Sequence, residues 1–119
     1  MDSILRLSLY SFNLDQALAN EETLVIFGDI PSGRFVQIAV SASEQTLIID
    51  IPVNSLSDLE SQWLGQNMDA VPDSDGNPVS YQKMIPTIQI DYAADYLEWL
   101  FTIVFRLRDS FSLTVKRFT

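Results

Sequence analysis

The side chains able to do chemistry in this chain are carboxylates, lysines, tyrosines and hydroxyls. Its 119 residues include no histidine and no cysteine. Histidine is the usual general base near neutral pH and the commonest metal ligand, and the cysteine thiolate is both a nucleophile and a metal ligand. Their absence excludes serine–histidine and cysteine–histidine catalysis and zinc sites built from these ligands. We therefore expect a non-enzymatic protein without catalytic residues, cofactor or metal.

Two short motifs resemble known sites but lack essential parts. The segment Asp73-Ser74-Asp75-Gly76-Asn77 resembles a calcium loop, yet Val71 occupies the first ligand position and Gln82 the position of the bidentate glutamate. Ser80 and Lys83 match the S-x-x-K pattern, in which a lysine activates a serine, without its companion motifs. The sequence therefore predicts a turn at residues 73–77 and a chance match at Ser80.

Three carboxylates have the spacing of one helix face. Asp91, Asp95 and Glu98 lie at positions i, i+4 and i+7, so a helix would align them to hold a hard cation or to transfer protons. No second segment offers ligands to complete such a site. Acidic residues in a first helical turn also complement the helix dipole. We expect these side chains to form a solvated face.

The charge of the chain favours a basic protein as partner. Sixteen acids and seven bases give a net charge of −9, with −10 on residues 1–82 and +1 on residues 83–119. Nucleic acids and anionic membranes are bound through lysine and arginine, so we expect the chain to bind neither. A negative field would instead steer a basic partner and speed its association.

The pattern of apolar residues predicts one α+β domain spanning residues 1–119, with an antiparallel β-sheet of four to six strands and two or three helices packed on it. Short connections join strands at 22–30, 34–42 and 46–53 into a meander over residues 22–53. The first of these has consecutive apolar residues, which predicts a central strand covered on both faces. Alternation favours further strands at 3–12 and 110–119.

The remaining segments predict a helix, a loop and an edge strand. Residues 54–65 read as a helix with Asn54 or Ser57 as its N-cap, and Gly65 fits its end. Asn13 fits the cap of a short helical turn. Prolines, glycine and aspartates predict a loop at 66–80. The segment 81–91 contains Pro86, which cannot donate to a sheet ladder, so we expect an edge strand there.

The most apolar stretch, residues 94–109, fits two structures. A helix would place a wholly polar stripe opposite an apolar face, whereas a strand would suit its β-branched and aromatic residues. The polar stripe and the acids at its start favour the helix. Charges inside the run exclude a membrane span. The apolar arc at 96–105 is wider than one sheet face needs, which leaves part of it for a partner.

The function that the sequence favours is an acidic inhibitor, immunity or anti-defence protein that masks a basic surface. We expect Trp99 as an apolar anchor and, as partner-binding acids, Asp58, Glu60, Asp69, Asp73 and Asp75. Two alternatives stay open: a structural or assembly subunit that forms homo-oligomers through residues 96–105, and an acidic secretion-chaperone-like protein. The start of the chain has no features of a signal peptide, so we expect a cytoplasmic protein.

Overall fold

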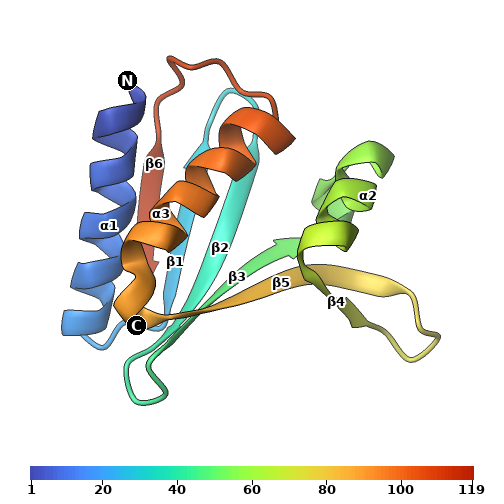
Figure 1. Ribbon diagram of the computed structural model, residues 1–119, viewed down its shortest axis with the longest axis horizontal. Helices are drawn as coiled ribbons and strands as arrows, with labels where there is room; N and C mark the ends of the chain where they lie inside the picture. Colours follow the sequence, from blue (N-terminus) through green and yellow to red (C-terminus); the bar gives the residue numbers. More distant parts are fainter.

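The computed structural model describes all residues 1–119 and consists of one six-stranded antiparallel sheet with three α-helices on one of its faces (Figure 1). The helices are α1 (Ser3–Ala19), α2 (Asp58–Asn67) and α3 (Ile90–Trp99). The strands are β1 (Leu24–Asp29), β2 (Arg34–Ser41), β3 (Thr46–Pro52), β4 (Asp69–Pro72), β5 (Pro78–Pro86) and β6 (Thr114–Phe118), in the spatial order β4-β5-β3-β2-β1-β6. The predicted α+β fold is confirmed.

The predicted meander is confirmed as β1, β2 and β3, which pair antiparallel in chain order. The predicted C-terminal strand is β6, which returns to pair with β1. β1 therefore lies between two neighbours, as expected of a central strand. The prediction that β1 is covered on both faces is wrong. Val25 and Phe27 are buried, whereas Leu24 and Ile26 stay half-exposed on the face without helices.

The predicted strand at 3–12 is wrong, because this segment is the first part of α1. Its alternating leucines, Leu5, Leu7 and Leu9, match the two-residue period of a strand. The helix instead buries Arg6, Tyr10, Leu14 and Ala17, whose spacing of four and three matches the helical repeat. The helix begins at an Asp2 cap rather than at Asn13, whose side chain donates to the Leu9 carbonyl within the helix.

The predicted helix at 54–65 is present as α2, with Ser57 as its N-cap. Ser57 Oγ accepts from the Glu60 amide and Glu60 Oε1 accepts from the Ser57 amide, which completes a capping box. Gly65 does not end the helix, which continues to Asn67. A side chain at Gly65 would touch the ring of Tyr81, which shows that α2 packs on the same sheet face as the core.

The predicted loop at 66–80 is only partly correct, because it contains β4 and the start of β5. The expected edge strand, β5, is consequently an inner strand between β3 and β4. Pro86 is tolerated because β4 ends its pairing at Gln82, which leaves the last residues of β5 with β3 alone. The turn at 73–77 is confirmed, with the Asp73 carboxylate accepting from the amides of Asp75 and Asn77.

The apolar stretch at 94–109 is helical as far as Val104, as the polar stripe indicated, but residues 105–109 lie outside the helix. α3 continues into a π-helical turn, Leu100–Val104, in which the Phe105 amide donates to the Leu100 carbonyl. The helix ends at Val104 with Phe105 as its C-cap, and the next residue, Arg106, has the left-handed φ of 57° that is common just after helix ends. No helix of the structure combines the length and apolarity needed to cross a membrane.

Candidate partner-binding surfaces

Residues 53–80 form an acidic lobe beside the body that carries α1 and α3 (Figure 1). The lobe comprises α2, β4, the β4–β5 turn and the first residues of β5. It contains five acids and no lysine or arginine: Asp58, Glu60, Asp69, Asp73 and Asp75. All five predicted partner-binding acids therefore belong to one lobe, although they do not all have the same surroundings.

Glu60 is used to hold the lobe on the body. Its side chain is 10% exposed, and both carboxylate oxygens lie 2.8 Å from Arg34 Nη2 on β2. The same guanidinium donates to the Ser55 carbonyl at 2.8 Å and lies over the Phe105 ring at 4.9 Å. Because Glu60 also closes the capping box, it is a structural residue and has no free oxygen for a partner.

The other lobe acids are exposed. Asp58 lies in the first turn of α2, and Asp73 and Asp75 lie in the β4–β5 turn. None of these three forms an ion pair within the chain. Asp69, the first residue of β4, aligns with Gln82 on the sheet face away from the helices. Asp58, Asp73 and Asp75 are therefore the acids available to a partner approaching the lobe.

Apolar side chains accompany these acids. Leu59 is 48% exposed beside Asp58, and Val79 is 49% exposed at the start of β5. Leu59 lines a cleft of about 130 Å³ between α2 and the end of α3, together with Trp63 and Val104. The guanidinium of Arg106 lies 5.8 Å from the Trp63 ring on one side of this cleft. The cleft therefore offers apolar contact area beside the exposed carboxylate of Asp58.

The predicted anchor Trp99 lies on α3 and is half-buried. Its ring packs against Tyr96 at a centroid distance of 5.3 Å, and Lys83 Nζ lies 5.1 Å from the Tyr96 ring. The Tyr96 hydroxyl is buried without a hydrogen-bond partner. Burial raises the pKa of Tyr96 to about 12, and neighbouring Tyr92 adds to this shift. Trp99 is thus part of an aromatic row on α3 and does not lie among the lobe acids.

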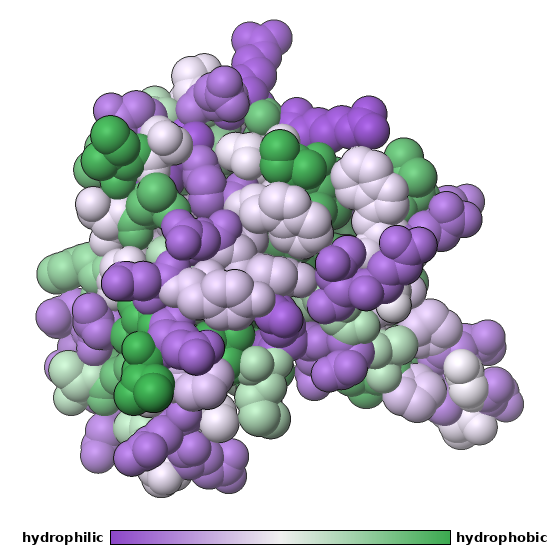
Figure 2. Space-filling model, viewed as in Figure 1, coloured by the Kyte–Doolittle hydropathy of each residue, from purple (hydrophilic) through white to green (hydrophobic).

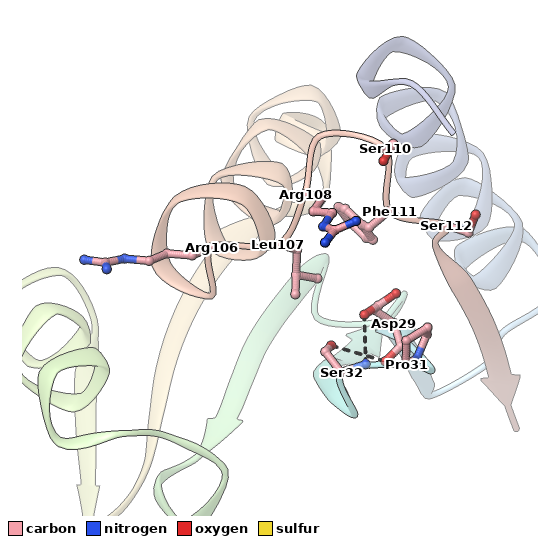
Figure 3. Close-up of a pocket in the computed structure, with 9 residues that line it drawn as sticks. All are labelled: Asp29, Pro31, Ser32, Arg106, Leu107, Arg108, Ser110, Phe111 and Ser112. Atoms are coloured by element: carbon pink, nitrogen blue, oxygen red, sulfur yellow. Dashed lines mark hydrogen bonds between the residues drawn. The ribbon is translucent and has the colours of Figure 1, made fainter.

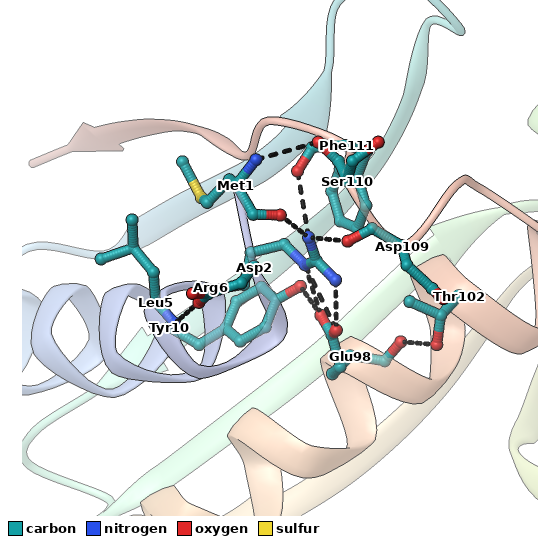
Figure 4. A network of polar contacts seen from close by, with 10 residues as sticks. All are labelled: Met1, Asp2, Leu5, Arg6, Tyr10, Glu98, Thr102, Asp109, Ser110 and Phe111. Carbon is teal, nitrogen blue, oxygen red and sulfur yellow. Dashed lines mark hydrogen bonds and ion pairs between the residues drawn. The ribbon is translucent and has the colours of Figure 1, made fainter.

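The polar cluster that joins α1 to α3 was not predicted from the sequence (Figure 4). Arg6 is fully buried, and its Nη2 lies 2.7 Å from Oε2 of Glu98. Its Nη1 donates to the backbone carbonyls of Met1, Asp109 and Phe111 at 2.7 to 3.1 Å. This one guanidinium therefore connects the start of α1, the last turn of α3 and the segment that follows α3.

Tyr10 completes this cluster by donating its hydroxyl to Glu98 Oε1 at 2.9 Å. Burial, with the Glu98 charge, raises the pKa of Tyr10, and the hydrogen bond to Glu98 raises the pKa of Arg6. Because Glu98 faces Arg6, it does not converge with the exposed Asp91 and Asp95. The structure contains no group of three acidic side chains placed to hold a metal ion.

The largest hollow, of about 570 Å³, lies between the β1–β2 turn and the segment after α3 (Figure 3). Arg108 points into it, whereas Arg106 points away toward α2. Across the hollow, the carboxylate of Asp29 accepts from the Ser32 amide at 3.1 Å. The Ser32 hydroxyl bonds only to backbone groups. The hollow holds no serine paired with a base, so its geometry gives no support to hydrolytic chemistry.

On the side that carries the helices, hydrophilic and hydrophobic side chains are interspersed, without one large apolar patch (Figure 2). The chain matches no family model, no curated protein and no solved structure.

Proposed function

We propose that this protein acts by binding a basic protein through the acidic lobe and masking its surface, without enzymatic activity. The observation that supports this function most directly is the charge of residues 53–80, which include five acids and no base. Arg34 neutralises only Glu60. The exposed Asp58, Asp73 and Asp75 keep their charge available to a partner.

The shape of the lobe supports the same function. Leu59, Val79 and the Trp63 cleft provide apolar contact area next to the free carboxylates. Apolar contacts hold a complex together, whereas surrounding charges speed association and select the partner. An inhibitor, immunity or anti-defence protein of the cytoplasm that covers a basic surface would use this combination.

A charge-neutral lobe variant tests this function. Immobilised wild-type protein and the triple variant Asp58→Asn, Asp73→Asn, Asp75→Asn should be compared in affinity capture from the host lysate. Asparagine keeps the carbonyl oxygen that the turn uses at Asp73, so the fold should be retained. We expect wild type to retain a basic protein that the variant loses, because both steering and contact charges are removed.

The matched control neutralises three acids outside the lobe: Asp15→Asn, Glu44→Gln and Asp91→Asn. All three are exposed, and the net charge changes by the same amount in both variants. Asp91, like Asp58, lies in the first turn of a helix. The control should retain the partner. Equal retention by wild type and both variants, or loss from both variants alike, would contradict binding through the lobe.

A further inference from the structure

The sheet face opposite the helices carries an apolar row that nothing in the chain covers. The row crosses five strands in register: Leu24 pairs with Phe118 and with Ala39, Ala39 pairs with Ile48, and Ile48 pairs with Met84. Met84 is 65% exposed and Phe118 is 46% exposed. A solvated face of an antiparallel sheet normally carries polar residues. A monomer would therefore leave this apolar row exposed to solvent.

A polar row runs beside the apolar one. In register from β6 to β4 it contains Lys116, Ile26, Gln37, Asp50, Gln82 and Asp69. Gln37 and Gln82 each donate to the Asp50 carboxylate, at 2.7 and 2.8 Å. Lys116, Asp50 and Asp69 are the charged residues that the strands place on this face. Its cation lies at one end and its acids lie toward the other.

We propose that this open face binds the open face of a second copy of the chain, about a twofold axis that runs parallel to the strands, midway between the two sheets and over β2. Under this symmetry, Ala39 faces Ala39 of the second copy, Leu24 faces Ile48, and Phe118 faces Met84. The smallest side chain of the apolar row lies on the axis, and larger ones meet on both sides. The two sheets pack as a β-sandwich about 10 Å apart.

Charge complementarity selects a second copy in this orientation. Lys116 then faces Gln82 of the second copy, whose Asp50 and Asp69 lie one strand to either side, at about 4.8 Å along the row. The contact occurs twice because of the symmetry. A twofold axis perpendicular to the strands would instead pair each strand with itself, so that Lys116 would meet β6 of the second copy, which places no acid on this face. Opposite charges meet only in the first arrangement, which also pairs the apolar rows.

The distribution of charge and shape agrees with this dimer. Most of the acids that give the chain its net charge of −9 lie away from the open face, and interface centres are depleted in charge. Gly28 leaves a hollow of about 450 Å³ on this face, lined in part by Ile26, Phe35 and Lys116. A side chain of the second copy can enter it. The lobe acids Asp58 and Asp73 stay free, so this inference does not depend on the proposed function.

Sedimentation equilibrium of the full chain tests the dimer. We expect twice the chain mass of 13.5 kDa, and Ala39→Arg should raise the dissociation constant by about tenfold or more, because it buries two like charges on the axis. Ile4→Arg is the matched control, since Ile4 is 75% exposed on α1. Circular dichroism confirms that each variant is folded. A monomer at all concentrations, or equal dimerisation of both variants, would overturn the proposal.

Cross-linking tests the position of the axis. The chain has no cysteine, so Ala39→Cys provides one thiol per chain, and a short bis-maleimide should link Ala39→Cys to itself but leave Ile4→Cys unlinked. Lys116→Glu should weaken the dimer by about tenfold, and adding Asp69→Lys should restore part of the loss by re-forming an opposite-charge pair. A dimer in which Ala39→Cys does not cross-link would overturn this geometry.

Discussion

The body and the acidic lobe are each held by one arginine, but in different surroundings. Arg6 is 1% exposed in its side chain and joins α1, α3 and the segment after α3. Arg34 is 26% exposed and joins β2 to Glu60 and Ser55 of the lobe. A buried pair is costly to break, whereas a partly solvated pair contributes less. The difference indicates a rigid body and a lobe with lower local stability.

This difference also separates acids that maintain the fold from acids that can bind. Glu98 forms an ion pair with Arg6, and Glu60 forms one with Arg34. Asp58, Asp73 and Asp75 have no cation within the chain and lie on the less tightly held part. Binding surfaces are commonly drawn from such low-stability regions, because they can adjust to a partner.

The largest expected effect is at Arg6. Arg6→Ala should lower the free energy of unfolding by about 3–5 kcal/mol, because it leaves Glu98 and three backbone carbonyls without their buried partner. Urea denaturation measures this loss. Arg108→Ala is the control, since Arg108 is exposed and forms no ion pair, and it should change stability by about 0.5 kcal/mol or less. Equal losses in the two variants would contradict the importance of the Arg6 cluster.

Arg34→Ala should have a smaller and more local effect. We expect a loss of about 1–2 kcal/mol, between the values typical of exposed and buried ion pairs. Because Arg34 holds the lobe on β2, amide hydrogen exchange should accelerate in α2 and remain unchanged in α1. Uniform acceleration of exchange across α1 and α2 would show that the lobe and the body open together, which would contradict a lower local stability of the lobe.

Removal of the α2 cap should have a still smaller effect. Ser57→Ala deletes the oxygen that accepts from the Glu60 amide at 3.2 Å, at a cost of about 1 kcal/mol. Asp2→Ala is the corresponding change in the body, since Asp2 accepts from the Leu5 amide at the start of α1. Exchange should accelerate in α2 for Ser57→Ala and not for Asp2→Ala. The same pattern in both variants would argue against a separately opening lobe.

At neutral pH, the smallest effect is expected at Tyr96, on the body. Its pKa is raised from 10.0 to about 12 in the folded chain, so the folded state holds the phenolic proton more tightly than the unfolded state. Its contribution is complete below pH 10 and is lost as the pH rises toward 12. Tyr96→Phe should reduce this alkaline loss of stability, measured by urea denaturation at pH 9 to 12. An unchanged pH profile would contradict the burial of this hydroxyl.

The sequence predicted those parts of the fold that depend on local signals. The meander and the Ser57–Glu60 capping box follow from turn and cap residues close together in the chain. The start of the chain was predicted wrongly, because alternating leucines resemble a strand and the partner of Arg6 lies 92 residues away. An arginine within a leucine-rich segment was the one available signal of a buried ion pair.

The pairing of the lobe acids and the apolar row of the open face could not be predicted from the sequence for the same reason. The acids of residues 53–80 were identified from composition, but only the fold shows that Glu60 is paired and that Asp58 is free. The apolar row from Phe118 to Met84 depends on the register of five strands. Register is fixed by pairing between distant segments, which composition and periodicity do not contain.

The most direct test of binding through the lobe is the salt dependence of association with the captured basic partner. Association rates of wild type and of the Asp58→Asn, Asp73→Asn, Asp75→Asn variant should be measured at several ionic strengths by stopped-flow fluorescence. We expect a rate that falls steeply with salt for wild type, and a slower, nearly salt-independent rate for the variant. The same rate and the same salt dependence in both proteins would contradict it.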